Sequence, residues 1–554
     1  MSISSRFVAR MAKLPPAETY NVAVEKNVKT LMPDGAVLLA DHYYPRQGPK
    51  RPTILMRCPY GRGNIFGMFF GRPFAERGYQ VFLQSCRGTF GSGGTLNPFH
   101  QERADGLATV EWMRKQDWFN GDLVTFGASY LGFAQWAIAK DLGPELKAMA
   151  TWVTSSEFRT VTYPGDALWL ESAFGWTSQV ATQEGSPLSL ITAMIAPERK
   201  AKPAYTHLPL NEVDEMVLGK PIKFWREWLE HNEPGDEWWT PCDFSQTVSE
   251  VTAPNNIGAG WYDIFLPLTL RDYMALARAG RKPYLTIGPW THTNLRHMVL
   301  SIGEALAWFR AQLQGDRRGL RELPVRIFMM GANEWRDYSE WPPSPAKPRR
   351  WYLHPGKVLS TQNPPESEPD RYRYDPANPT PGVGGAGMST NSGPKDQRAL
   401  EARADVLVYT SAVLDRDTEV IGPVQAELFV QSSLEHTDFF ARLCDVDPSG
   451  KSINVCDSLL RLTPGRPPRQ PDGTLRVCID LWPTAYRFKQ GHRIRVQVSS
   501  GAHPRWARNP GSGEPLATAT KLIAADQTVY HDPAHPSAII LPMMSSPDLR
   551  GMAK

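Results

Sequence analysis

The stretch Gly121-Asp-Leu-Val-Thr-Phe-Gly-Ala-Ser129-Tyr-Leu-Gly-Phe-Ala-Gln-Trp136 decides the fold. A short apolar run from Leu123 to Phe126 meets a Gly-Ala-Ser corner, and no helix breaker follows Gly132. This pattern predicts a strand, a sharp turn and a helix. A serine at such a turn is held at the tip with its hydroxyl exposed, which makes Ser129 the candidate nucleophile.

The motif departs from the full G-x-S-x-G elbow. Leu131 stands where the second glycine belongs, and the glycine comes one residue later at Gly132. Taken alone, the stretch also fits a buried serine in a purely structural turn. The choice between these two interpretations depends on the rest of the chain.

Composition limits the classes of protein to consider. A chain of 554 residues exceeds one compact core, so two to four domains are expected. The net charge of +4 gives no reason to expect nucleic acid or a membrane surface as a partner. No apolar run approaches the ~18 residues of a membrane span. The N-terminus carries Arg6, Arg10 and Lys13 without an apolar core, which favours a frayed basic start over a transit peptide.

The six cysteines are scattered, with no C-x-x-C pair and no metal-ligand spacing. This distribution predicts neither a metal site nor a disulfide framework. A reducing compartment fits it best, and we expect a cytoplasmic protein.

Strand and helix patterns alternate in the first third of the chain. Buried strands are expected at 52–56, 79–83 and 146–153, with a first hairpin at 36–44 and a helix over 105–115. This alternation predicts an α/β fold built on a mainly parallel, helix-covered sheet, with a first part at residues 1–154.

The secondary-structure pattern of the sequence changes after residue 154 and again after residue 345. Residues 155–247 hold six tryptophans and no strand alternation, so we expect a helical cap inserted over the carboxyl ends of the strands. Residues 248–345 return to the sheet, with a helix at about 266–279 and a strand at 283–287. Residues 346–554 contain runs of period two, at 424–430, 475–481 and 494–498, which predict an antiparallel sandwich or jelly roll.

A catalytic serine needs a base to take its proton and an acid to hold that base. In α/β-hydrolases the acid and then the histidine follow the serine, each after a later strand. Asp263 closes the run Gly260-Trp-Tyr, and His292 lies in the loop after the strand expected to end at Ile287. Ser129, Asp263 and His292 therefore form the predicted triad.

Each of these residues also has an ordinary interpretation. Asp263 alone could be a solvated or capping aspartate, and His292 alone a loop histidine. His207 and His297 compete for the role of base, but neither directly follows a predicted strand. The agreement of three placements in the required order favours the triad.

An acyl-transfer site also needs hydrogen-bond donors for the oxyanion. By its position after the nucleophile, the amide of Tyr130 is one donor. The loop Arg57-Cys-Pro-Tyr60 follows the second strand, where this fold normally places its other donor. Tyr60 could offer its hydroxyl, although packing is the commoner fate of such a tyrosine.

The chain resembles the cocaine esterase and X-prolyl dipeptidyl-peptidase group of serine hydrolases, and it is most like the cocaine esterase branch. The resemblance covers nearly the whole chain. It rests on Pro33-Asp-Gly35, Arg57-x-Pro-Tyr60, Cys86-Arg-Gly88, Gly127-Ala-Ser-Tyr-Leu-Gly132, Gly260-Trp-Tyr-Asp263, Gly288-Pro-Trp-x-His292, Met330-Gly-Ala-Asn-Glu-Trp335, Gly393-Pro-x-Asp-Gln-Arg398, Thr437-Asp-Phe439 and Val496-Gln-Val-Ser-Ser500.

This resemblance implies an α/β-hydrolase fold with an inserted helical cap and a C-terminal β jelly-roll domain. It implies the triad Ser129, Asp263 and His292, and it gives the Tyr60 hydroxyl to the oxyanion hole beside the Tyr130 amide. Trp176 and Phe265 fall where the family lines its acyl pocket. No metal or organic cofactor is implied.

The departures from the family bear on the substrate. Relatives that cleave α-amino acid esters carry acidic residues just after the triad aspartate, whereas Ile264, Phe265 and Leu266 follow here. An apolar wall cannot neutralise a substrate ammonium group. The segment Gly384-Gly-Ala-Gly-Met-Ser-Thr390 is mostly small where the cocaine esterase branch is apolar, so cocaine itself is not the expected substrate.

Together these points predict a carboxylic-ester hydrolase acting on a small-molecule ester. The alternatives are a dipeptidyl-peptidase or amino-ester hydrolase with the same machinery, and a binding module beside a decayed hydrolase. A jelly roll can serve as a dimer surface or can merely close the site, so the sequence leaves a homodimer and a monomer both open.

Overall fold

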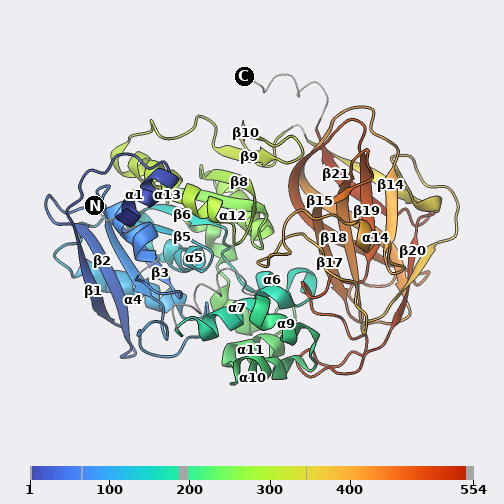
Figure 1. Ribbon diagram of the computed structural model, residues 1–554, viewed down its shortest axis with the longest axis horizontal. Helices are drawn as coiled ribbons and strands as arrows, with labels where there is room; N and C mark the ends of the chain where they lie inside the picture. Colours follow the sequence, from blue (N-terminus) through green and yellow to red (C-terminus); the bar gives the residue numbers. More distant parts are fainter. Residues whose placement is uncertain (1–2, 64–65, 186–197, 345, 545–554) are drawn as a thin grey trace.

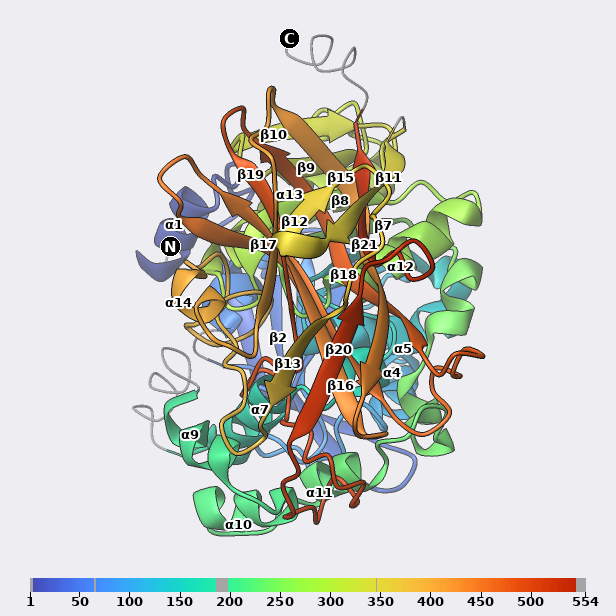
Figure 2. The ribbon, with the colours of Figure 1, turned by 90° about the vertical axis from the view of Figure 1, so that its right-hand side faces the viewer.

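The computed structural model describes residues 3–63, 66–185, 198–344 and 346–544. Two large β sheets lie side by side, and a group of helices lies against both of them (Figure 1). The first sheet carries helices on both faces, whereas the second belongs to an all-β domain that is seen face-on in Figure 2.

In the described part of the chain, the first sheet has ten strands in the order β1-β2-β4-β3-β5-β6-β7-β8-β9-β10. The strands from β4 to β9 run parallel to their neighbours, and the outer pairs are antiparallel. The bounds are β1 Val22–Leu31, β2 Val37–Pro45, β3 Thr53–Cys58, β4 Gln80–Ser85, β5 Leu123–Ala128, β6 Leu146–Trp152, β7 Asn255–Tyr262, β8 Tyr284–Thr291, β9 Val325–Met329 and β10 Glu334–Tyr338.

Both faces of this sheet are buried at its central strands, such as β3, β4 and β7. In β3, Leu55 points into one apolar cluster, while Ile54 and Met56 point into another on the opposite face. A strand that is covered on both faces has no polar side, which is why these strands read as continuous apolar runs. The covering helices are α1 Ile3–Met11, α3 Arg72–Ala75, α4 Glu102–Arg114, α5 Tyr130–Leu142, α12 Leu266–Arg278 and α13 Leu295–Gln314.

The segment between β6 and β7 is helical where it is described. Its longest helix is α7, Leu170–Thr182. The others are α6 Arg159–Thr162, α9 Glu198–Thr206, α10 Val213–Leu218 and α11 Lys223–Glu230. Its core is aromatic: Trp225 and Trp228 are fully buried.

The second sheet includes the order β13-β20-β15-β21-β11-β12-β14-β19-β16-β17, and β18 pairs with β15. Burial alternates strictly along β18 from Leu475 to Asp480, as period two requires when one face is solvated. The bounds are β11 Lys347–His354, β12 Val358–Ser360, β13 Asp370–Tyr374, β14 Leu407–Ser411, β15 Thr418–Ser432, β16 Thr437–Val446, β17 Ser452–Leu462, β18 Leu475–Phe488, β19 Arg493–Ser499, β20 Ala525–Tyr530 and β21 Ala538–Met543, with the short helix α14 at Arg398–Glu401.

One apolar core joins the two sheets. Ile327 of the first sheet and Val420 of the second belong to the same buried cluster. The main chain crosses as well, since the Met330 amide donates to the Ala485 carbonyl at 3.0 Å and the Arg487 amide donates to the Met330 carbonyl at 2.8 Å. The all-β domain is therefore packed into the body of the molecule.

The predicted α/β-hydrolase fold with a C-terminal all-β domain is confirmed. Two local expectations are wrong. Residues 3–11 are not frayed, because α1 forms there and buries Val8 completely. Strand β8 does not end at Ile287 but continues through Pro289 to Thr291, so His292 directly follows the strand. No described helix is long and apolar enough to cross a membrane.

Candidate active site

Ser129 sits at the sharp turn between β5 and α5, as the motif predicts. Its backbone has φ 58° and ψ −126°, a conformation that costs free energy in a residue other than glycine. Surrounding hydrogen bonds hold it there: the Ser129 amide donates to the Trp152 carbonyl at 2.9 Å, and Thr154 Oγ1 donates to the Ser129 carbonyl at 2.8 Å. This strained backbone conformation places the Ser129 side chain at the carboxyl edge of the sheet.

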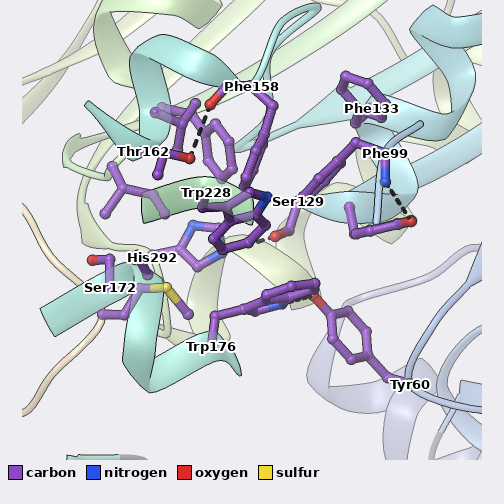
Figure 3. Close-up of a pocket in the computed structure, with 16 residues that line it drawn as sticks. Tyr60, Phe99, Ser129, Phe133, Phe158, Thr162, Ser172, Trp176, Trp228 and His292 are labelled. Carbon is purple, nitrogen blue, oxygen red and sulfur yellow. Dashed lines mark hydrogen bonds between the residues drawn. The ribbon is translucent and has the colours of Figure 1, made fainter. Parts of the chain in front are cut away.

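His292 and Asp263 follow β8 and β7 at that same edge. His292 Nε2 lies 3.0 Å from Ser129 Oγ (Figure 3). On the other side of the ring, His292 Nδ1 lies 2.7 Å from Asp263 Oδ2. Asp263 is completely buried, and its other oxygen accepts the Phe265 amide at 2.8 Å. A carboxylate on Nδ1 selects the tautomer that leaves the Nε2 lone pair facing the serine hydroxyl.

The rival histidines are placed elsewhere. His207 lies 3.3 Å from Glu212, away from Ser129. His297 is buried in α13, and its Nε2 contacts the backbone carbonyl of His292 at 2.8 Å. Burial lowers the pKa of His297 to about 4, so this ring is neutral and holds the loop of His292 in place.

Two hydrogen-bond donors lie near the serine, the Tyr130 amide and the Tyr60 hydroxyl. The Tyr130 amide belongs to the first turn of α5, where N–H groups have no partner within the helix. Tyr60 lies two residues after β3, and it lines the same pocket as Ser129, whose side chain is close enough to influence the pKa of the Tyr60 hydroxyl. Burial raises the pKa of Tyr60 well above its ordinary value, which keeps the hydroxyl protonated as a donor.

A buried ionic network lies behind these donors, and no motif in the sequence indicates it. The Tyr130 hydroxyl donates to Glu102 Oε1 at 2.8 Å, and Arg57 Nη1 donates to Glu102 Oε2 at 2.5 Å. Arg57 is three residues before Tyr60, so Glu102 ties the segments of both donors together. Arg57 follows the strand expected at 52–56 and Glu102 precedes the helix expected over 105–115, so their pairing depends on tertiary structure.

The serine opens onto an apolar pocket. Trp176 and Phe265, the two predicted lining residues, both line it. Among the described residues that form its wall, none is acidic. The others are Tyr60, Phe99, Tyr130, Phe133, Phe158, Val161, Thr162, Ser172, Ala173, Trp228, Ile264, His292 and Met388.

Met388 is the contribution of the all-β domain to this wall. It lies in the segment 384–390, which is mostly small in sequence, and it still reaches the pocket. The wall therefore combines the first sheet, the helical segment and the all-β domain. In the part of the chain that the structure describes, no group of three or more His, Cys, Asp or Glu side chains is placed to hold a metal ion.

Comparison with known proteins agrees with this architecture. Residues 34–294 match the family model of the X-Pro dipeptidyl-peptidase (S15 family), and residues 320–540 match that of the X-Pro dipeptidyl-peptidase C-terminal non-catalytic domain. The cocaine esterase of Rhodococcus sp. (strain MB1 Bresler) is 34% identical over 95% of this chain and 99% of its own length.

Solved structures share the fold at lower identity. An aminopeptidase from a marine sediment Thaumarchaeota archaeon superposes with a TM-score of 0.79 at 22% identity, over 96% of this chain and 98% of its own. An α-amino acid ester hydrolase gives 0.78 at 21% identity with the same coverage. With the identity to cocaine esterase extending over nearly the whole of both chains, this chain belongs to the cocaine esterase and X-Pro dipeptidyl-peptidase family of serine hydrolases.

Proposed function

We propose that this protein hydrolyses carboxylic esters through an acyl-enzyme on Ser129. The observation that carries the proposal is the continuous contact from Asp263 through His292 to Ser129, with the serine held in a strained elbow. A histidine held by a buried aspartate is what a serine needs to become a nucleophile at neutral pH.

The reaction follows from these contacts. His292 Nε2 takes the proton of Ser129 as Oγ attacks the ester carbonyl, and Asp263 holds the imidazolium. The Tyr60 hydroxyl and the Tyr130 amide donate to the oxyanion. His292 then returns the proton to the leaving alcohol, and a water molecule deprotonated by His292 releases the acid.

The pocket wall supports a substrate with an aromatic or bulky apolar acyl group. Aromatic rings from Trp176, Trp228, Phe99 and Phe158 surround the space next to the serine. Offset and edge contacts between such rings and an aromatic acyl group add to the free energy of apolar burial. The described wall offers no carboxylate for a substrate ammonium group, which disfavours aminoacyl esters and dipeptides.

The test is intact mass after incubation with a fluorophosphonate, followed by peptide mapping. We expect one adduct, on Ser129, and a loss of ester turnover of about 10⁶-fold in Ser129→Ala with the fold unchanged. No adduct on a folded protein, or substantial turnover by Ser129→Ala, would overturn the assignment.

The same enzyme should prefer esters to amides. We expect p-nitrophenyl esters of aromatic acids to react faster than aminoacyl p-nitroanilides of matched size. A preference for the anilides would contradict the apolar pocket and favour the dipeptidyl-peptidase alternative.

A reducing, cytoplasmic setting is part of the proposal, supported by six free cysteines of which five are buried.

A further inference from the structure

Helix α7 of the inserted segment touches the Tyr60 hydroxyl directly. Trp176 Nε1 lies 2.9 Å from Tyr60 Oη, and the two side chains meet beside Ser129 (Figure 3). Trp176 is 9% exposed, so water does not compete freely for its N–H. The indole N–H can only donate, which makes the Tyr60 oxygen the acceptor of this hydrogen bond.

The direction of this hydrogen bond fixes the Tyr60 proton. A phenol hydroxyl has one hydrogen, and the Trp176 N–H occupies the side from which the oxygen accepts. The hydrogen of Tyr60 therefore points away from Trp176, and among the described residues the Ser129 side chain is a polar neighbour that influences this hydroxyl. In the reaction this is the side on which the oxyanion forms. The hydrogen bond from Trp176 also offsets part of the rise that burial causes in the pKa of Tyr60, which makes the hydroxyl a better donor.

The same helix holds the backbone of the Tyr60 loop. Gln183 follows the last residue of α7 and is 2% exposed, and its Nε2 donates to the Pro59 carbonyl at 2.8 Å. Pro59 immediately precedes Tyr60, so α7 binds this loop at its main chain and at its functional hydroxyl. A helix that only lined the acyl pocket would need neither the Trp176–Tyr60 nor the Gln183–Pro59 hydrogen bond.

We propose that Trp176 is a positioning residue for the oxyanion hole, whose N–H orients the Tyr60 hydroxyl toward the oxyanion. The inserted helix α7 then supports transition-state stabilisation as well as lining the acyl pocket. This inference rests on the proposed esterase function and deepens it. It predicts that loss of the Trp176 N–H affects the chemical step rather than substrate binding.

The test is a double-mutant cycle between Trp176→Phe and Tyr60→Phe. Trp176→Phe keeps an aromatic ring and removes the N–H, and we expect kcat for an aromatic ester to fall about tenfold with little change in KM. Tyr60→Phe should lower kcat by about 10²–10³-fold. In the Tyr60→Phe background, Trp176→Phe should cost less than about twofold, because no hydroxyl remains to orient.

Trp228→Phe is the matched control. Trp228 stacks against Trp176 at 5.9 Å between ring centroids and lines the same pocket, but it has no hydrogen bond to Tyr60 among the described contacts. This variant should change KM according to acyl size and leave the coupling with Tyr60→Phe near zero. Replacing the Trp176 indole by a benzothiophene, which keeps the ring shape without an N–H, gives the same test if the phenylalanine variant is poorly folded.

Additive losses in the cycle would overturn the inference, because Trp176 would then act only as a pocket wall. A benzothiophene enzyme that keeps the kcat of the wild type would overturn it as well. Failure of the esterase proposal looks different: the wild type itself would neither turn over esters nor accept a fluorophosphonate on Ser129.

Discussion

At the scale of single residues, the site depends on charges that are buried beside the reacting groups. Arg57 and Glu102 are both almost inaccessible, with side chains 1% and 3% exposed. Removing one partner of a buried ion pair leaves the other charge without compensation, which costs more than the pair contributes as a whole. Glu102 is the centre of this network, because it also accepts the Tyr130 hydroxyl.

Glu102→Gln should lower the free energy of unfolding by about 3 kcal/mol, because Arg57 loses its ion-pair partner and the nearby carboxylate of Asp105, at 3.8 Å, compensates its charge less well. Urea denaturation measures this change. Glu111→Gln on the same helix is the control: its partners Arg114 and Lys115 are exposed, and its loss should stay below about 0.5 kcal/mol. Equal losses in the two variants would show that the Arg57–Glu102 pair does not stabilise the fold.

A functional residue can be predicted from sequence when the local pattern around it marks its role, and it cannot when that role depends on tertiary contacts. Ser129, Asp263 and His292 each stand at the end of a recognisable strand, so local pattern is enough to nominate them. Glu102 carries no such signal, because its partners Arg57 and Tyr130 come from segments that only tertiary structure brings together. A charged residue at the start of a helix usually faces solvent, and nothing in the sequence marks this one as buried.

At the scale of elements, the unusual spacing of the elbow has a steric reason. Leu131 takes the place of the second glycine, and the glycine at 132 is where α5 comes closest to Thr154. A Cβ at Gly132 would lie 2.4 Å from Thr154 Cγ2, far inside contact distance. Thr154 in turn holds the Ser129 carbonyl.

Gly132→Ala should therefore destabilise the protein by about 1–3 kcal/mol, because overpacking exceeds the ~1 kcal/mol that alanine contributes to a helix. The rate of fluorophosphonate labelling at Ser129 should fall as well. Gly303→Ala in α13 is the matched control, since its nearest neighbours would lie at 3.5 Å or beyond. In thermal denaturation that control should be more stable than the wild type; if Gly132→Ala behaves the same way, the steric argument fails.

The strands that the sequence predicts are those with a clear apolar pattern along the chain. The strands β3 to β8 and β15, β18 and β19 carry continuous or strictly alternating apolar residues. Helix α13 is not predicted despite its 20 residues, and the prediction for β8 stops short because Pro289 suggests a strand end. Pairing with β7 carries β8 past this proline, with Tyr262 opposite Thr291. Local propensity gives way here to tertiary contacts.

At the scale of the whole molecule, four histidines with lowered pKa values contribute to the response to acid. Burial lowers the pKa of His42, His100, His297 and His503 to about 4. In unfolded chains these groups titrate near ~6.5, so between about pH 6.5 and 4 the unfolded state binds protons that the folded state does not. The free energy of unfolding therefore falls as the pH falls through this window.

Thermal denaturation should show the midpoint dropping steadily from about pH 7 to about pH 4.5. His42→Gln should flatten this slope, because the glutamine amide can still donate to Gln80, which His42 contacts at 3.1 Å, and has no proton to take up. A midpoint that is constant across this range, or an unchanged slope in His42→Gln, would contradict the assignment of neutral buried rings.

Met388 also has a consequence for biosynthesis. A ribosome adds about 5–20 residues per second, and domains generally fold in the order in which they emerge. Ser129, Asp263 and His292 leave the ribosome before Met388, yet Met388 completes the wall around them. A nascent chain can thus bring Ser129, Asp263 and His292 together before it has a complete pocket wall. Under the proposed esterase function, selectivity for the acyl group would be acquired only when the last domain has been made and has docked.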